Sequence, residues 1–268
     1  MSSMSRRSAT KRMLGLAGAG AFLACGGTAL LATPATAADG GRPRKGPEAL
    51  RKEQARIHSG TTSVNGWEMQ RSVNSGGHIW TRPVPGTGMR IDVRIGAVER
   101  VLVHLVQRFH YEIRALGPGD VTGWCAPGTV RKGLPESNRA SGTAVTILPG
   151  HYPPGASGGF LPLETAVVRD VLAELEGTVR WGGDDPKPDE SLFSLDVPPG
   201  DARLEKVAAR LKDWRTTPGA GPGTTVDIRS SGRRAKAGQL RARPPPGRPT
   251  HPGGGPPRGG RAPPPPPP

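Results

Sequence analysis

The C-terminal segment from about Pro218 limits the part of this chain that can form a folded domain. From there to the last residue the sequence is mostly glycine, proline and arginine, with almost no clustered apolar residues. Such a segment buries too little apolar surface to offset the entropy lost on ordering, and its final prolines favour a polyproline II conformation. We therefore expect residues 218–268 to form a disordered basic tail, and we look for a folded domain only in the residues before it.

The N-terminal segment has the three parts of an export signal. A basic start with Arg6 and Arg7 precedes an apolar stretch from 13 to 31, and a small-x-small cleavage pattern follows at 35–37. The paired arginines resemble the twin-arginine consensus. The alternatives are a membrane anchor and a lipoprotein modified at Cys25, but the apolar stretch is weakly hydrophobic and the lipobox is poor. We expect residues 1–37 to be a cleaved twin-arginine signal peptide, so that the mature protein is secreted and has no transmembrane anchor.

The net charge of +15 is concentrated at the two ends of the chain. The predicted signal carries four basic residues and the tail carries nine against one acidic residue, which leaves +3 for the middle. The high isoelectric point therefore does not predict specific nucleic-acid binding by the folded part. A flexible basic tail outside a cell favours anionic wall polymers and phospholipid head groups as partners; the alternative is a tail without a selected function.

The remaining residues divide into a linker and one domain. Residues 38–62 are polar and basic and predict a linker with one helical turn near its end, and residues 63–217 have ordinary single-domain size. Only Cys125 remains after cleavage, so no intrachain disulfide can form and the fold depends on its core.

Apolar periodicity in the middle segment indicates a mixture of helices and strands. We predict an α+β domain, a small antiparallel sheet flanked by helices, with the long Gly- and Pro-rich stretch 117–133 as a loop. The predicted helices begin at about Ala97 and cover 167–175 and 201–214; the predicted strands are 109–113, 144–148, 179–181 and 192–195.

Two segments of this domain carry a family resemblance. The first runs from Ser137 to Thr146 and reads Ser-Asn-Arg-Ala-Ser-Gly-Thr-Ala-Val-Thr; the second begins Trp-Gly-Gly-Asp at 181 and continues to Phe193. Together they resemble the M15 (VanY-like) D-alanyl-D-alanine carboxypeptidases, which are zinc enzymes of the cell wall. The resemblance covers about residues 80–215. It implies zinc ligands at positions 139, 146 and 192 and a general base at Asp189.

The residues at those three positions depart from the family pattern. Arg139 stands where the family has its first histidine, Thr146 where it has aspartate, and Leu192 where it has its second histidine. A catalytic zinc needs three protein ligands, whereas leucine has no donor atom and arginine carries a fixed positive charge. We expect no zinc or other cofactor, and a catalytically inactive protein in which Asp189 is a remnant of the general base.

The alternative is an active wall peptidase that uses non-standard ligands. His151 lies five residues beyond the lost aspartate position and is the best substitute, whereas His104 and His110 fall within predicted helix or strand patterns typical of structural residues. No pair of these histidines shows a ligand spacing.

A binding role is the remaining expectation for the domain. Arg131, Ser137 and Arg139 fall near the place where the family holds the C-terminal carboxylate of a peptide, and arginine suits carboxylate recognition. We therefore predict binding of peptidoglycan peptides without cleavage. The competing interpretation is that Arg139 points to solvent or pairs with Asp189.

Overall fold

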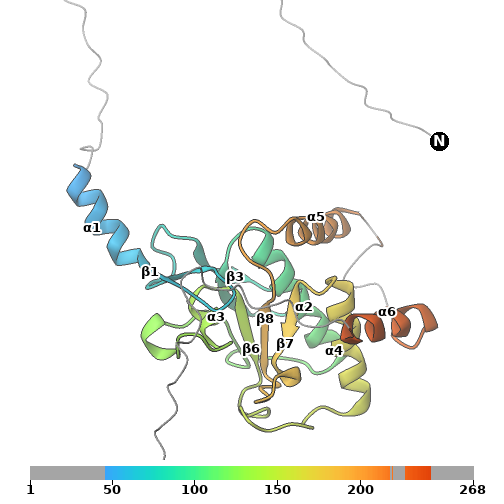
Figure 1. Ribbon diagram of the computed structural model, residues 1–268. Coiled ribbons are helices and arrows are strands. Elements are labelled where there is room, and N and C mark those ends of the chain that lie inside the picture. Colours follow the sequence, from blue (N-terminus) through green and yellow to red (C-terminus); the bar gives the residue numbers. More distant parts are fainter. Residues whose placement is uncertain (1–45, 218, 220–226, 243–268) are drawn as a thin grey trace, which may run out of the picture. The chain divides into compact units, whose positions relative to one another are not determined.

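The structure is a computed structural model that describes residues 46–217, 219 and 227–242, and it is an α+β fold (Figure 1). The predicted signal peptide lies outside the described residues, as do most of the predicted tail and the start of the linker. Among the described helices, none is long and apolar enough to span a membrane. The helices are α1 (Pro47–Ile57), α2 (Ala97–Glu112), α3 (Ser137–Ala140), α4 (Pro162–Glu174), α5 (Ala202–Thr216) and α6 (Ser231–Ala242); the strands are β1 (His58–Thr62), β2 (Glu68–Gln70), β3 (Ile79–Pro83), β4 (Arg90–Arg94), β5 (Val121–Thr122), β6 (Ala144–Ile147), β7 (Val179–Trp181) and β8 (Leu192–Leu195).

The main sheet has four strands in the order β5-β6-β8-β7, and all three pairings are antiparallel. Two further hairpins, β1-β2 and β3-β4, precede it in the chain. The small antiparallel sheet and its flanking helices confirm the predicted fold class.

The two faces of the main sheet differ in chemistry because side chains alternate along each strand. One face carries apolar residues of the hydrophobic core, among them Val145, Ile147, Phe193, Leu195 and Trp181. The residues between them point to the opposite face, where Thr122, Thr146 and Leu192 lie side by side through the register of β5, β6 and β8. The second face is therefore the more polar one, and it carries two of the three motif positions.

Helices α2 and α4 cover the apolar face and meet across it (Figure 1). Helix α2 runs through Glu112, so the predicted strand at 109–113 is wrong. Phe109 continues the buried helical stripe of Leu102 and Leu105, and it is 3% exposed, whereas Tyr111 is exposed. A helix that is already formed extends at little cost, and an alternation over five residues does not distinguish the two structures.

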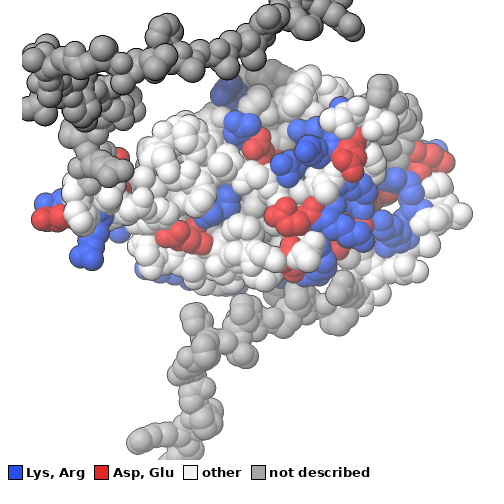
Figure 2. Space-filling model, turned by 90° about the horizontal axis from the view of Figure 1, so that it is seen from above, with Lys and Arg blue, Asp and Glu red and all other residues white. Residues whose placement is uncertain are grey.

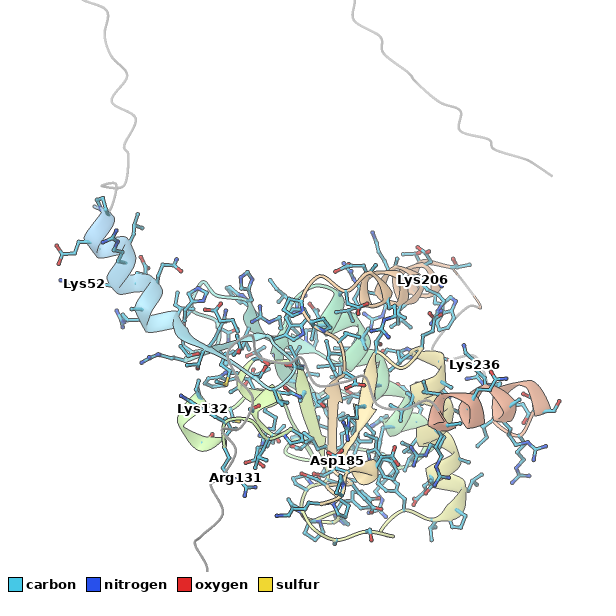
Figure 3. The ribbon with its side chains drawn as sticks, viewed as in Figure 1. Lys52, Arg131, Lys132, Asp185, Lys206 and Lys236 are labelled. Carbon is cyan, nitrogen blue, oxygen red and sulfur yellow. The ribbon has the colours of Figure 1, made fainter. Side chains whose placement is uncertain are left out.

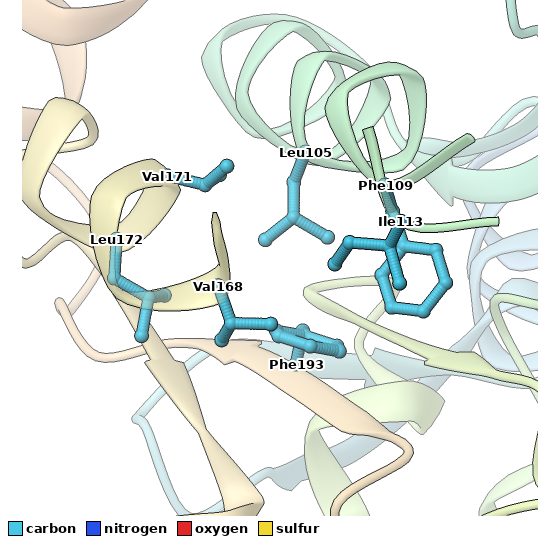
Figure 4. A pocket seen from close by; sticks show the side chains of 7 residues that line it. All are labelled: Leu105, Phe109, Ile113, Val168, Val171, Leu172 and Phe193. Carbon is cyan, nitrogen blue, oxygen red and sulfur yellow. The ribbon is translucent and has the colours of Figure 1, made fainter. Parts of the chain in front are cut away.

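The space between α2, α4 and the sheet is almost filled. A gap of about 10 Å³ remains there, lined only by apolar side chains (Figure 4). That volume is about the minimum for one water molecule, and the lining offers no polar partner. The gap is a packing defect of the core and not a ligand site.

The segment before α2 is more ordered than the sequence indicated. The predicted linker 38–62 contains β1 and the eleven-residue helix α1, and the four strands β1 to β4 were not predicted. Most of these strands are too polar to give a clear pattern, although Ile91 and Val93 on β4 do alternate and are buried.

Helix α6 lies within the segment predicted to be disordered. It is rich in arginine and lysine, none of its residues is fully buried, and it packs against α4. Arg233 donates to Asp170, and Leu240 lies against Gly177 just beyond α4. The expectation of disorder does not hold for 231–242, because α6 obtains charge partners and apolar contacts from the domain that composition alone does not reveal.

Candidate functional site

The three substituted motif positions lie on three different elements of the fold. Arg139 is on the short helix α3, Thr146 is on β6 and Leu192 is on β8. Thr146 and Leu192 are paired directly across the antiparallel strands, so their side chains share one face. Thr146 is likewise paired with Thr122 on β5.

Arg139 reaches this group through β5. Its Nε donates to the backbone oxygen of Gly123 at 3.1 Å, and its Nη2 donates to the Thr122 hydroxyl at 3.2 Å. The Thr122 and Thr146 hydroxyls are hydrogen-bonded to each other. A chain of contacts therefore runs from the first motif position to the second, and the strand register continues it to Leu192.

A zinc ion does not fit the residues at these positions. Thr146 and Leu192 are 6% and 3% exposed, and the Thr146 hydroxyl is already bonded to Thr122. Arg139 offers only N–H donors, whose fixed positive charge repels a cation. The donor set lacks the imidazole, thiolate and carboxylate groups that hold zinc in proteins.

Asp189 does not pair with Arg139. Its Oδ1 accepts the Ser191 hydroxyl at 2.6 Å and the Ser191 backbone N–H at 3.2 Å, which closes a local turn before β8. The neighbouring Glu190 is the buried carboxylate, at 6% exposed. Its two oxygens accept the backbone N–H groups of Gly158 and Gly159, each at 2.8 Å, and thereby fasten that loop to β8.

Ser137 and Arg131, the other two predicted binding residues, are engaged elsewhere. Ser137 is fully buried, and its hydroxyl accepts the Val64 N–H and donates to the Leu134 carbonyl oxygen. It therefore anchors α3 instead of facing a ligand. Arg131 is exposed and forms a two-point ion pair with Glu136 (Figure 3). The hydrogen bond from Arg131 is the main cause of a lowered pKa of Glu136.

A buried hydroxyl and amide network explains why the first motif folds as it does. The Ser141 hydroxyl contacts those of Ser63 and Thr143, and Asn65 donates to the Thr143 hydroxyl. Asn138 accepts the Asn65 backbone N–H. The serines and threonines of this motif thus hold the turn at 63–67 against α3, which positions Arg139.

The three histidines considered as substitute ligands have different surroundings and do not form a common site. His151 is exposed on a turn. His104 is buried, and its Nε2 lies 2.6 Å from Glu174 Oε1. His110 Nδ1 accepts the Leu116 N–H. Among the described residues, no group of three or more His, Cys, Asp or Glu side chains is arranged to hold a metal ion.

A second cluster of functional groups was missed by the sequence analysis. Between α2, α4 and α6, the buried Arg108 contacts Glu112, Asp170 and Glu174, and Arg233 contacts the same Asp170 and Glu174. The spacing of four residues from Arg108 to Glu112 and from Asp170 to Glu174 was the available signal, since such pairs share a helix face.

The electrostatics of this cluster follow from its pairing. Burial acts to raise the pKa of Glu174, but the His104 hydrogen bond and the Arg108 charge outweigh it and lower that pKa to about 2. Burial likewise acts to lower the pKa of Arg108, but the hydrogen bonds and charges of its carboxylate partners outweigh burial and raise that pKa above its ordinary value. Both shifts favour the charged forms of Glu174 and Arg108, so each stabilises the other within the cluster.

Comparisons with known proteins add no family to this description. No family model matches the chain, and neither a curated protein nor a solved structure matches it.

Proposed function

We propose that this chain is a secreted, catalytically inactive relative of the M15 (VanY-like) D-alanyl-D-alanine carboxypeptidases that binds cell-wall peptides. The proposal rests on one observation: the fold brings the three motif positions, 139, 146 and 192, close together. Thr146 and Leu192 come from segments 46 residues apart, yet they are paired across β6 and β8, and Arg139 reaches the residue that flanks Thr146 on the other side. A chance match of two short motifs gives no reason for this arrangement, whereas a shared ancestral metal site does.

Inactivity follows from the chemistry of the substituted residues. The three positions supply a guanidinium, a hydroxyl and an aliphatic side chain, none of which binds zinc in such sites. Without the ion no water is activated, and Asp189 is occupied by Ser191.

Peptide binding is supported by the unused capacity of Arg139. It donates to a carbonyl oxygen and a hydroxyl, both neutral, and no described carboxylate forms an ion pair with it. Its Nη1 has no acceptor among the described residues. A partly exposed guanidinium held on one side and unpaired on the other suits the C-terminal carboxylate of a peptide.

Calorimetry with a synthetic peptide that ends in D-Ala-D-Ala tests this binding. We expect the peptide to bind the full-length chain and its C-terminal amide to bind at least about tenfold more weakly, since a charge-assisted hydrogen bond contributes about 1.5–3 kcal/mol. Arg139→Ala should weaken peptide binding to the same extent. Lys132→Ala is the matched control, because it removes a positive charge from an exposed position near Arg131 (Figure 3). Absence of peptide binding contradicts the proposal, and equal affinity for acid and amide contradicts the role of Arg139.

A second experiment tests the family relationship without a ligand. The triple variant Arg139→His, Thr146→Asp and Leu192→His should bind zinc stoichiometrically, measured as metal content after dialysis. The double variant without the change at 192 is the control and should lose the metal. A folded triple variant that binds no zinc means that the two motifs do not correspond to those of the M15 family.

A further inference from the structure

A solvent-accessible cavity lies on the opposite side of α4 from the sheet, where three helices meet. Its volume is about 220 Å³, far more than the ~10–15 Å³ that one water requires. Charged and aromatic side chains line it: Asp170 and Glu174 from α4, Arg210 and Trp214 from α5, and Arg233 and Lys236 from α6. In Figure 2, basic side chains gather on the half of the molecule that carries α5 and α6, with acidic side chains between them.

The acceptor groups of the cavity are already in use. Asp170 accepts Arg233 Nε at 2.6 Å on one oxygen and Arg108 at 3.0 Å on the other. Glu174 Oε1 is hydrogen-bonded to His104 and Arg108, and its Oε2 accepts from Arg233. Neither carboxylate therefore remains free to bind a cationic ligand.

Several N–H donors around the cavity, in contrast, have no hydrogen-bond partner. Arg210 donates to Glu176 and to the Glu174 backbone, but its Nε is buried and has no hydrogen-bond partner. Among the described residues, none accepts from Lys236 Nζ, Trp214 Nε1 or Arg233 Nη1. The unused hydrogen-bonding capacity around the cavity thus consists of N–H groups, three of them on cationic side chains.

We propose that this cavity binds a small oxyanion of the phosphate class. A ligand with several acceptor oxygens accepts at once from the unpaired donors of Arg233, Trp214 and Lys236, and hydrogen bonds from cationic donors to an anion are stronger than neutral ones. Arg210 is paired with Glu176 and Arg108 with Glu112, so the cationic donors that remain for an anion are those of Arg233 and Lys236. Arg210 is also held in place by stacking over Trp214, with its guanidinium carbon 5.4 Å from the ring centre. The site is separate from the motif residues of β6 and β8, so it does not depend on the function proposed above.

Titration calorimetry of the full-length chain with inorganic phosphate at low ionic strength tests the site. Lys236→Gln removes a cationic donor that has no protein partner, so it should leave the fold unchanged and weaken phosphate binding about tenfold. Lys206→Gln on α5 is the control, because Lys206 is also exposed but does not line the cavity (Figure 3); its ion pair with Glu176, at 3.7 Å, lies at the surface. We expect it to change the affinity less than about twofold, since a surface charge contributes little.

The outcomes separate a built site from general charge attraction. Absence of phosphate binding overturns the proposal, as does an equal loss of affinity in the two lysine variants. Acetate in place of phosphate tests the ligand class, because a carboxylate has only two acceptor oxygens. Acetate should bind more weakly, and equal affinity would contradict selection for phosphate. Unfolding temperatures of both variants equal to that of the unaltered chain are expected, and a large decrease for Lys236→Gln alone would assign that residue to the fold instead.

Discussion

The motif region around β6 and the charged cluster between α2, α4 and α6 both contain arginine, and they use it differently. In the motif region, Arg139 donates to neutral oxygens of Gly123 and Thr122 and has no described carboxylate partner. In the cluster, Arg108 and Arg233 donate to carboxylates that are themselves buried. The first arrangement leaves a positive charge available to a ligand, whereas in the second the charges are paired with one another between helices.

The motif residues and the buried ion pairs therefore lie in different parts of the molecule. The motif serines and threonines form neutral hydrogen bonds that shape α3. The residues that would be most costly to leave unpaired belong instead to helices without any motif, because a buried charge needs a partner far more than an exposed one does. Three predictions test this contrast.

The largest effect is expected for Arg108, which is 4% exposed. Arg108→Met leaves Asp170 and Glu174 with fewer cationic partners in a buried setting, and it should lower the free energy of unfolding by about 3–5 kcal/mol. Urea denaturation measures this change. The control Arg131→Met breaks an exposed ion pair and should cost less than about 1 kcal/mol. Similar losses in the two variants would remove the distinction between the regions.

The next effect concerns acid stability and Glu174. Because its folded-state pKa lies at about 2, below the ordinary value of 4.5, its ionisation stabilises the fold above pH 4.5. That contribution is lost as the pH falls from 4.5 toward 2, by an amount on the order of 3 kcal/mol at 1.36 kcal/mol per unit.

Glu174→Gln should therefore have a flatter stability profile than the unaltered chain between pH 4.5 and 2, measured by urea denaturation at each pH. Its stability at neutral pH should be lower. An unchanged acid slope would mean that Glu174 does not carry this pH dependence.

The smallest effect is expected where the cluster reaches α6. Arg233→Gln weakens the hydrogen bonds to Asp170 and Glu174 and should cost about 1–2 kcal/mol, since the side chain is partly exposed. Arg234→Gln, at the exposed neighbouring position, should be neutral within about 0.5 kcal/mol. Thermal unfolding of the two variants measures the difference. If both were neutral, α6 would not be part of the folded unit.

Much of the fold could be predicted from residue periodicity, but less of the site. The buried stripes of α2, α4 and α5 and the short apolar strands β6, β7 and β8 gave clear patterns. The polar hairpins of 58–94 did not, and their order depends on tertiary contacts such as those of Gln70 with the backbone of 78–79.

The motif spacing singled out Thr146 and Leu192, which the structure pairs across two strands, but it did not indicate their partners. The pairing of Thr146 with Leu192 depends on strand register, and Thr122 lay in a predicted loop. The Arg108 cluster depends on which helix faces meet, which no single helix pattern determines.

The packing of α6 against α4 also constrains the spacing of residues within α6. Arg233, Lys236 and Leu240 are spaced by three and four residues, so they occupy one side of a helix. A shift of one residue in the sequence would rotate all three by about 100° around the helix axis and away from α4. The contact between this part of the tail and the domain therefore depends on the spacing of these three residues as much as on their chemistry.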